Sequence, residues 1–166
     1  MSLVLNGNGT IQNLVAGGLP DGSVTADDIA SLPAGSVIQV VQSNFTGNSS
    51  TTSTAVQTLF SASITPSSAS NKVLAMVTTV GYSNGTNNSI TLRLYRGTIS
   101  DTQIATTMVE DGGGSYETYN FALNKLDSPS TTSAQTYTVG YNQAQTIYAN
   151  MNGNNTSTLI LMEIAA

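Results

Sequence analysis

The feature that most constrains the fold of this chain is its supply of small polar side chains. Thr 24, Ser 21 and Asn 16 together account for 61 of the 166 residues. Ser and Asn compete with a helix for backbone hydrogen bonds and Thr is restricted at its first side-chain torsion, so these residues favour turns and strands. Charged residues make up only 8% of the chain, compared with about 25% in ordinary soluble domains. Hydroxyl and amide side chains must therefore keep the surface hydrated. The composition predicts an all-β protein.

The composition also excludes several classes of chemistry. Without Cys or His, the chain cannot form disulfides, thiolate or imidazole metal sites, a Ser-His-Asp triad or a Cys-His pair. The formal net charge is −5 and there is no cluster of Lys or Arg to neutralise phosphates, so we expect no binding of nucleic acid. No stretch approaches the roughly 18 apolar residues of a membrane helix, so we expect no membrane insertion.

Residues 1–36 differ from the rest and are expected to form an attachment arm. They contain six glycines and two prolines but no Lys or Arg, so regular elements within them must be short. One helical turn is plausible in the segment VTADDIASL, where Thr25 can act as the cap and Asp27 and Asp28 lie in the first turn. A loop that contains a small turn fits this segment equally well.

From residue 37 onward the chain consists of strand-like runs separated by turn signals. These runs lie at 37–42, 56–64, 72–82, 90–96, 102–109, 116–126, 136–141, 146–151 and 157–164. The polar tract at 43–54 is expected to be a loop or a frayed edge. Since no helical pattern is long enough for crossover connections, the sheets should be antiparallel. We therefore expect a jelly-roll-like β-sandwich head over residues 37–166.

Two of these runs predict the core most directly. The run at 72–82 is apolar on both faces near its start, which predicts a strand covered on both sides or one at the centre of an oligomer. The run at 90–96 alternates cleanly, which places Ile90, Leu92 and Leu94 inward and Arg93 and Tyr95 outward. Two further runs show a similar pattern, with Phe60, Ala62 and Ile64 on one face of the run at 56–64 and Tyr119, Phe121 and Leu123 in alternation in the run at 116–126.

Carboxylates are the only plausible catalytic groups in this composition. The pairs Asp27–Asp28 and Glu110–Asp111 are adjacent in sequence, and adjacent strand residues point to opposite faces, so neither pair is a natural acid-base dyad. The segment DGSVTADD is the nearest approach to a calcium site, but it lacks the EF-hand alternation. The seven tyrosines could stack on sugars, although strand surfaces and subunit contacts explain them better. We expect no catalytic residue, cofactor or metal.

Several phrases of the sequence resemble a family of virion proteins of tailed phages. They are LNGNGTIQNLVAGGLPDGSVTADDIA, LPAGSVIQVVQ, ITPSSASNKVLAMVTT, LRLYRGT, LDSPSTTSAQTYTVGY and STLILMEI, and they span nearly the whole chain. Such proteins are abundant in marine and cyanobacterial phages and are usually labelled tail fibre or structural protein. The resemblance implies a homotrimer with a glycine-rich attachment segment and a jelly-roll head that points outward.

Within this resemblance, a capsid decoration or cement protein is favoured because the chain shows no repeat or heptad of a long shaft. Contacts with the major capsid protein are expected from the arm residues Leu3, Leu5, Ile11, Leu14, Leu19, Asp21, Asp27 and Asp28. The trimer interface is expected at Val73, Ala75, Val77, Arg93 and Tyr95. Arg93 and Arg96 are expected to pair with an acid across a subunit boundary.

Two alternatives remain open from the sequence. One is a tail fibre or receptor-binding tip, whose distal loops at 83–89 and 110–115 would contact a host surface glycan. The other, a weaker one, is an enzyme that cleaves polysaccharides. The expected location is the virion, on the capsid surface or on the tail.

Overall fold

The computed structural model describes residues 4–5, 11–12, 32–51, 53–83, 89–110, 117–142, 147–149 and 155–166. All regular elements in these residues are β-strands. The chain divides into two compact units, 1–32 and 33–166. In the first unit, β1 (Val4–Leu5) pairs with β2 (Ile11–Gln12) in antiparallel fashion. The second unit, which we call the head, contains the other ten strands.

The head strands follow the runs expected from the sequence. They are β3 (Val37–Phe45), β4 (Ser49–Thr51), β5 (Gln57–Ile64), β6 (Lys72–Ser83), β7 (Ser89–Arg96), β8 (Thr102–Glu110), β9 (Glu117–Asp127), β10 (Gln135–Asn142), β11 (Ile147–Ala149) and β12 (Ser157–Ile164). The polar tract 43–54 is partly strand, since β3 runs through its first residues and β4 lies within it. Both strands lie at a sheet edge, which agrees with the frayed-edge alternative.

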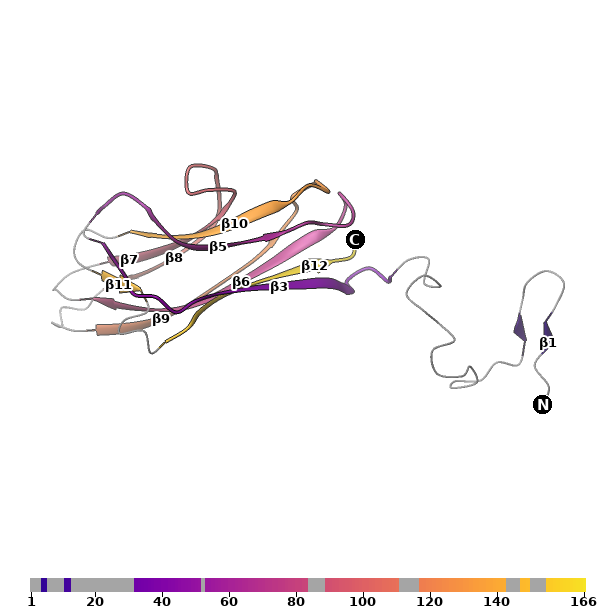
Figure 1. Ribbon diagram of the computed structural model, residues 1–166, viewed down its shortest axis with the longest axis horizontal. Coiled ribbons are helices and arrows are strands. Elements are labelled where there is room, and N and C mark those ends of the chain that lie inside the picture. Colours follow the sequence, from indigo (N-terminus) through magenta and orange to yellow (C-terminus); the bar gives the residue numbers. More distant parts are fainter. Residues whose placement is uncertain are drawn as a thin grey trace. The chain divides into compact units, whose positions relative to one another are not determined.

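Two antiparallel sheets form the two layers of the head (Figure 1). The first, which we call the β7 sheet, has the order β5-β10-β7-β8. In the second, the β6 sheet, β9 lines one side of β6, while β12 and then β11 line the other side. β3 pairs with β12 and β4 with β11 at the outer edge. When β3 and β4 are counted as one strand, and β12 and β11 as another, the two sheets have the strand order of a jelly roll.

The hydrophobic core lies between these two sheets. The alternating apolar residues of the three runs at 56–64, 90–96 and 116–126 are buried there: Phe60, Ala62, Ile64, Ile90, Leu92, Leu94, Phe121 and Leu123. Tyr119 is partly buried and packs against them. The central strand β6 supplies Val73, Ala75 and Val77, at most 1% exposed. The prediction that the run at 72–82 forms the middle of the fold is confirmed, because β6 pairs with three other strands.

The chain itself covers part of the outer face of the β7 sheet. Tyr95 pairs with Thr138 on the side away from the core, as alternation predicts, yet it is only 5% exposed. Gly140 lies close by, where a Cβ would approach Val56 Cγ1 to 2.8 Å and both Ile99 Cγ2 and Tyr95 Cε2 to 3.2 Å. The segments before β5 and after β7 therefore cover Tyr95, so little of it is available to a partner.

The turn after β7 is held by its own polar groups. Gly97 has a φ of +99°, a left-handed conformation that favours glycine. Asp101 Oδ2 accepts hydrogen bonds from the backbone N of Thr98 at 2.7 Å and from its hydroxyl at 2.8 Å. These two hydrogen bonds lower the pKa of Asp101. Thr138 fastens the turn to the sheet, because its hydroxyl donates to the Gly97 carbonyl at 2.6 Å.

Candidate interaction surface

A fully buried carboxylate lies near the end of β12. Glu163 is 0% exposed and is on the inward side of the strand, like Leu161. Its Oε2 accepts a hydrogen bond from Gln39 Nε2 at 2.6 Å. Its Oε1 accepts from the backbone N and the hydroxyl of Ser67, both at 2.7 Å, and from Asn71 Nδ2 at 2.6 Å. The carboxylate thus joins β12 to β3 and to the connection between β5 and β6.

The hydrogen bonds fix the charge state of this carboxylate. Burial by itself raises the pKa of Glu163, but the donors from Asn71, Gln39 and Ser67 stabilise the charged form and lower the pKa to about 2. Both oxygens are already engaged by the chain's own donors. Glu163 therefore serves as a structural anchor, and the sequence analysis did not identify it.

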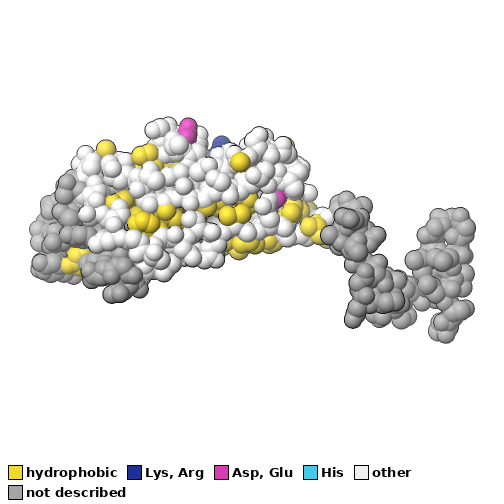
Figure 2. Space-filling view, in the orientation of Figure 1, with side chains coloured by type: hydrophobic (Ala, Val, Ile, Leu, Met, Phe, Trp, Pro, Cys, Tyr) yellow, Lys and Arg dark blue, Asp and Glu magenta, His cyan; other side chains and the backbone are white. Residues whose placement is uncertain are grey.

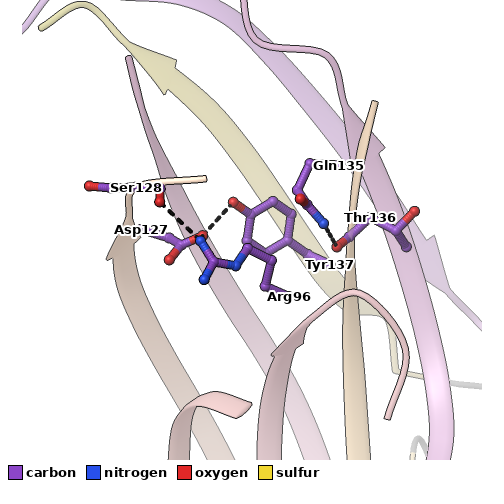
Figure 3. Close-up of polar contacts among 6 residues, drawn as sticks. All are labelled: Arg96, Asp127, Ser128, Gln135, Thr136 and Tyr137. Atoms are coloured by element: carbon purple, nitrogen blue, oxygen red, sulfur yellow. Dashed lines mark hydrogen bonds and ion pairs between the residues drawn. The ribbon is translucent and has the colours of Figure 1, made fainter. Parts of the chain in front are cut away.

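A second buried polar cluster connects β7, β9 and β10 (Figure 3). The Tyr137 hydroxyl donates to Asp127 Oδ2 at 2.8 Å, and Arg96 Nη1 lies 3.5 Å from the same oxygen. Arg96 also donates to the Ser128 carbonyl at 2.9 Å. Burial raises the pKa of Tyr137 above its usual range and the hydrogen bond to Asp127 adds to this, so the phenol stays protonated.

This cluster corrects the expectation for the arginines. The acid beside Arg96 is Asp127 of the same chain. Arg93 donates to the side-chain oxygen of Asn142, also in the same chain.

Removal of the Tyr137 hydroxyl should destabilise the head measurably. In Tyr137→Phe, the buried Asp127 loses a hydrogen-bond donor, so we expect the free energy of unfolding to fall by about 1–2 kcal/mol. Tyr95→Phe is the matched control, because its hydroxyl makes only a 3.5 Å contact with Gln103 Oε1, and we expect a change below about 0.5 kcal/mol. Urea unfolding followed by circular dichroism measures both. Equal losses in the two variants would contradict a special role for the Tyr137–Asp127 bond.

The outer face of the β6 sheet presents apolar side chains. Alternation turns the neighbours of the core residues outward. One row crosses the whole sheet at successive paired positions: Val40 on β3, Met162 on β12, Leu74 on β6 and Leu126 on β9. Val40 is 57% exposed and Leu126 48%, while Leu74 and Met162 are half-buried. We call these four residues the apolar row.

The surroundings of the apolar row carry a single charge. On one side lies exposed Lys72, the outward neighbour of Leu74 on β6, and the row on the other side is uncharged. The next row pairs Gln42, Ile160, Met76 and Asn124. Among the described outward positions of β3, β6, β9 and β12, Lys72 is the one charged side chain, and it lies at the end of β6. Figure 2 shows patches of hydrophobic side chains along the head and very few charged ones on the side in view.

The outer face of the β7 sheet is different in character. Ser61 and Ser63 of β5 lie opposite Thr138 and Thr136 of β10 on this face, and Ser63 and Thr136 share a hydrogen bond of 2.8 Å. Among the large apolar side chains exposed in the described residues, Met108 lies on this side, at 54% exposure. The two outer faces of the head thus offer different chemistry to a partner.

Three of the expected interface residues lie in the core of the chain itself. Val73, Ala75 and Val77 are buried in the core by the chain itself. The alternation that makes β6 apolar on both sides puts these three between the sheets and puts Leu74 and Met76 outside. A partner can therefore contact the outward neighbours and not the three residues expected from the sequence.

Several expected features lie outside the described residues or their described side chains. For Leu5 and Ile11 the structure gives the backbone of short strands only. Residues 24–31 of the proposed helical turn and residues 84–88 and 111–115 of the two expected loops lie outside the described residues. So do the remaining arm positions Leu3, Leu14, Leu19, Asp21, Asp27 and Asp28. In the part of the chain that is described, no group of three or more His, Cys, Asp or Glu side chains could hold a metal ion. That same part includes no helix long and apolar enough to cross a membrane.

Comparison with known proteins gives fold-level likenesses only. No protein-family model and no curated protein matches the chain. Among solved structures, it is similar to infectious bursal disease virus, Gx strain, at 15% identity and a TM-score of 0.41, over 79% of this chain and 39% of the viral one. It is also similar to Bacillus endospore appendages, described as disulfide-linked pili, at 13% identity and a TM-score of 0.33, over 83% of this chain and 98% of the other. The chain spans about two fifths of the viral chain.

Proposed function

We propose that this chain is a non-enzymatic structural subunit of a phage virion, a homotrimeric capsid decoration protein that binds the shell through its N-terminal arm. The observation that carries this proposal is the jelly-roll head with one outer face that is apolar and nearly uncharged. An apolar patch rimmed by polar residues marks a contact with another macromolecule. The resemblance of the sequence to tailed-phage virion proteins supplies the setting.

Three of the described carboxylates support a structural role. Glu163, Asp127 and Asp101 each accept hydrogen bonds from donors of the same chain, and each of them holds a turn or joins strands. A catalytic acid or base needs a free lone pair or proton within reach of a substrate. These three groups are committed to the fold instead.

The surface chemistry suits a particle exposed to changing media. The described residues contain one ion pair, Arg96–Asp127, and most of the polar contacts are made by hydroxyls and amides. Salt weakens contacts between exposed charges but has little effect on apolar contacts and neutral hydrogen bonds. Assembly through such a surface should therefore change little with ionic strength.

The arm is the part proposed to bind the shell. Asp21, Asp27 and Asp28 give it negative charge without any Lys or Arg, which suits basic residues of the major capsid protein. The apolar arm residues Leu3, Leu5, Ile11, Leu14 and Leu19 would pack on the same surface. A subunit that binds only the assembled shell stabilises that shell by linkage.

The location and copy number of the protein on purified virions test this function. We expect many copies that scale with the number of capsid subunits, all on heads, as measured by quantitative mass spectrometry of separated heads and tails. The combined variant Asp21→Asn, Asp27→Asn and Asp28→Asn should bind undecorated heads at least tenfold more weakly, with an unchanged circular dichroism spectrum. Glu110→Gln, an exposed acid on β8, is the control and should bind normally. A few copies confined to tails would contradict decoration and would favour the receptor-binding tip.

A further inference from the structure

We infer that the outer face of the β6 sheet is the contact between copies of this chain, with the apolar row at its centre. The inference rests on the self-assembly part of the proposed function and assigns it a surface. It replaces the interface expected from the sequence, whose β6 residues lie in the core.

The low charge of this face indicates that its partner is a second copy of the chain. A nucleic acid would require a set of Lys and Arg residues, and a strongly charged protein would require opposite charges, yet Lys72 is the one charged side chain among the described outward positions. A second copy presents the same apolar face with its single charge, Lys72, at the end of β6, so the contact buries no unpaired charge when Lys72 lies at its rim. The face is thus complementary to itself.

The contrast with the other sheet supports a partner at this position. The fold covers the outer face of the β7 sheet near Gly140 with its own side chains, Val56 and Ile99. On the β6 sheet, Val40 and Leu126 remain about half exposed at the two ends of the apolar row. Half-buried Ile160 and Met76 extend the apolar area along the two central strands. Cover from outside the head would remove this whole area from water.

The size of the face fits a stable interface. The β6 sheet is four strands wide and β6 is 12 residues long. Strands lie about 4.8 Å apart and rise about 3.3 Å per residue, so the face measures about 19 Å by about 40 Å, on the order of 750 Å². A standard interface buries about 800 Å² per partner, so the whole face has the area of one such interface. Around a threefold axis, this area would be divided between the two neighbouring copies.

The molecular mass in solution tests the inference. We expect the full chain, of 17.1 kDa, to sediment as a trimer at micromolar concentration. The double variant Val40→Lys and Leu126→Lys places like charges at the contact and should sediment as a single chain, with a circular dichroism spectrum that is unchanged. Met108→Lys is the matched control, since Met108 is 54% exposed on the other sheet, and it should remain a trimer. A monomeric wild type, or a double variant that stays trimeric, would overturn the inference.

Thiol labelling gives a second measurement that does not depend on a charged substitution. The chain has no Cys, so Leu126→Cys and Met108→Cys each introduce one reporter. In the assembled protein, the Leu126→Cys thiol should react with a maleimide at least tenfold more slowly than the Met108→Cys thiol. Equal rates would overturn the inference, and so would protection of Leu126→Cys in a monomer, which would assign the cover to the chain's own arm.

These outcomes can be separated from those of the proposed function. A trimer that dissociates on Val40→Lys and Leu126→Lys substitution supports the inference even where the protein is absent from virion heads. Conversely, a monomer found in many copies on heads would overturn the inference and leave the attachment role in place.

Discussion

Glu163→Gln is expected to lower the free energy of unfolding at neutral pH more than the other substitutions proposed for this protein. The substitution removes the negative charge that the Gln39, Ser67 and Asn71 donors surround, and the new amide NH₂ group, itself a donor, faces some of these donors. Hydrogen bonds to a charged group contribute about 1.5–3 kcal/mol each, and Glu163 accepts several, so we expect a loss of about 3–5 kcal/mol. The melting temperature should fall by roughly 10 °C for a chain of this size.

The same carboxylate predicts how stability depends on pH. A carboxyl with a depressed pKa in the folded chain stabilises that chain above its unfolded pKa, and the contribution is lost as the pH falls through the folded pKa. For Glu163, the contribution is complete above about 4.5 and disappears towards about 2. The difference corresponds to on the order of 3 kcal/mol. Urea unfolding at pH values from 6 to 2.5 should therefore show a decline in wild type that is much smaller in Glu163→Gln.

Two controls keep this prediction specific. Glu110→Gln removes an exposed carboxylate from β8 and should keep the wild-type pH profile. Ser67→Ala removes one of the donors without removing the charge, so it should cost about 1 kcal/mol and keep a weakened pH dependence. Parallel pH profiles for wild type and Glu163→Gln would show that the acid sensitivity arises elsewhere.

Leu161→Ala should destabilise the head by about 2–5 kcal/mol, the usual range for a buried Leu that leaves a cavity. Leu161 lies on β12 in the core with 0% exposure and pairs with Val41 and Ala75 on the two adjacent strands. Because β12 lies between β3 and β6, the gap would open at the centre of the sheet, where the surrounding strands have little freedom to close it. Thermal unfolding and urea unfolding both measure the loss.

Met108→Ala is the control for Leu161→Ala. It removes an apolar side chain of similar size from a strand position that is 54% exposed, so its effect should stay within about 0.5 kcal/mol. A loss below about 1 kcal/mol for Leu161→Ala would indicate that the two sheets are not packed as described.

The strand positions were predictable because local pattern determines them. The alternation in ITLRLYR places Ile90, Leu92 and Leu94 in the core, and turn residues separate each run from the next. The same alternation in STLILMEI puts Glu163 on the side of Leu159 and Leu161, so its burial could have been inferred from the sequence. Its donors could not, since Gln39 and Asn71 are 124 and 92 residues away along the chain.

The expected interface failed for a related reason. An apolar run on both sides of β6 indicates cover on both faces, but it does not say which side faces the second sheet. The long-range pairing of β6 with β9 and β12 decides that, and it turns Val73, Ala75 and Val77 inward. The cover over Tyr95 was missed because Val56 and Ile99 come from segments whose place over the β7 sheet is set by tertiary structure.

The start of the head is fastened to its last residues. Gly35 N donates to the Ala165 carbonyl at 2.8 Å, Ala165 N donates to the Ser36 carbonyl at 2.9 Å, and β3 then pairs with β12 in antiparallel register. A mechanical load applied to residue 33 enters the head through these bonds. A force along the strand direction loads all the hydrogen bonds between β3 and β12 at the same time. A force perpendicular to the strands breaks these hydrogen bonds one after another, so the head should resist force along the strands better than force perpendicular to them.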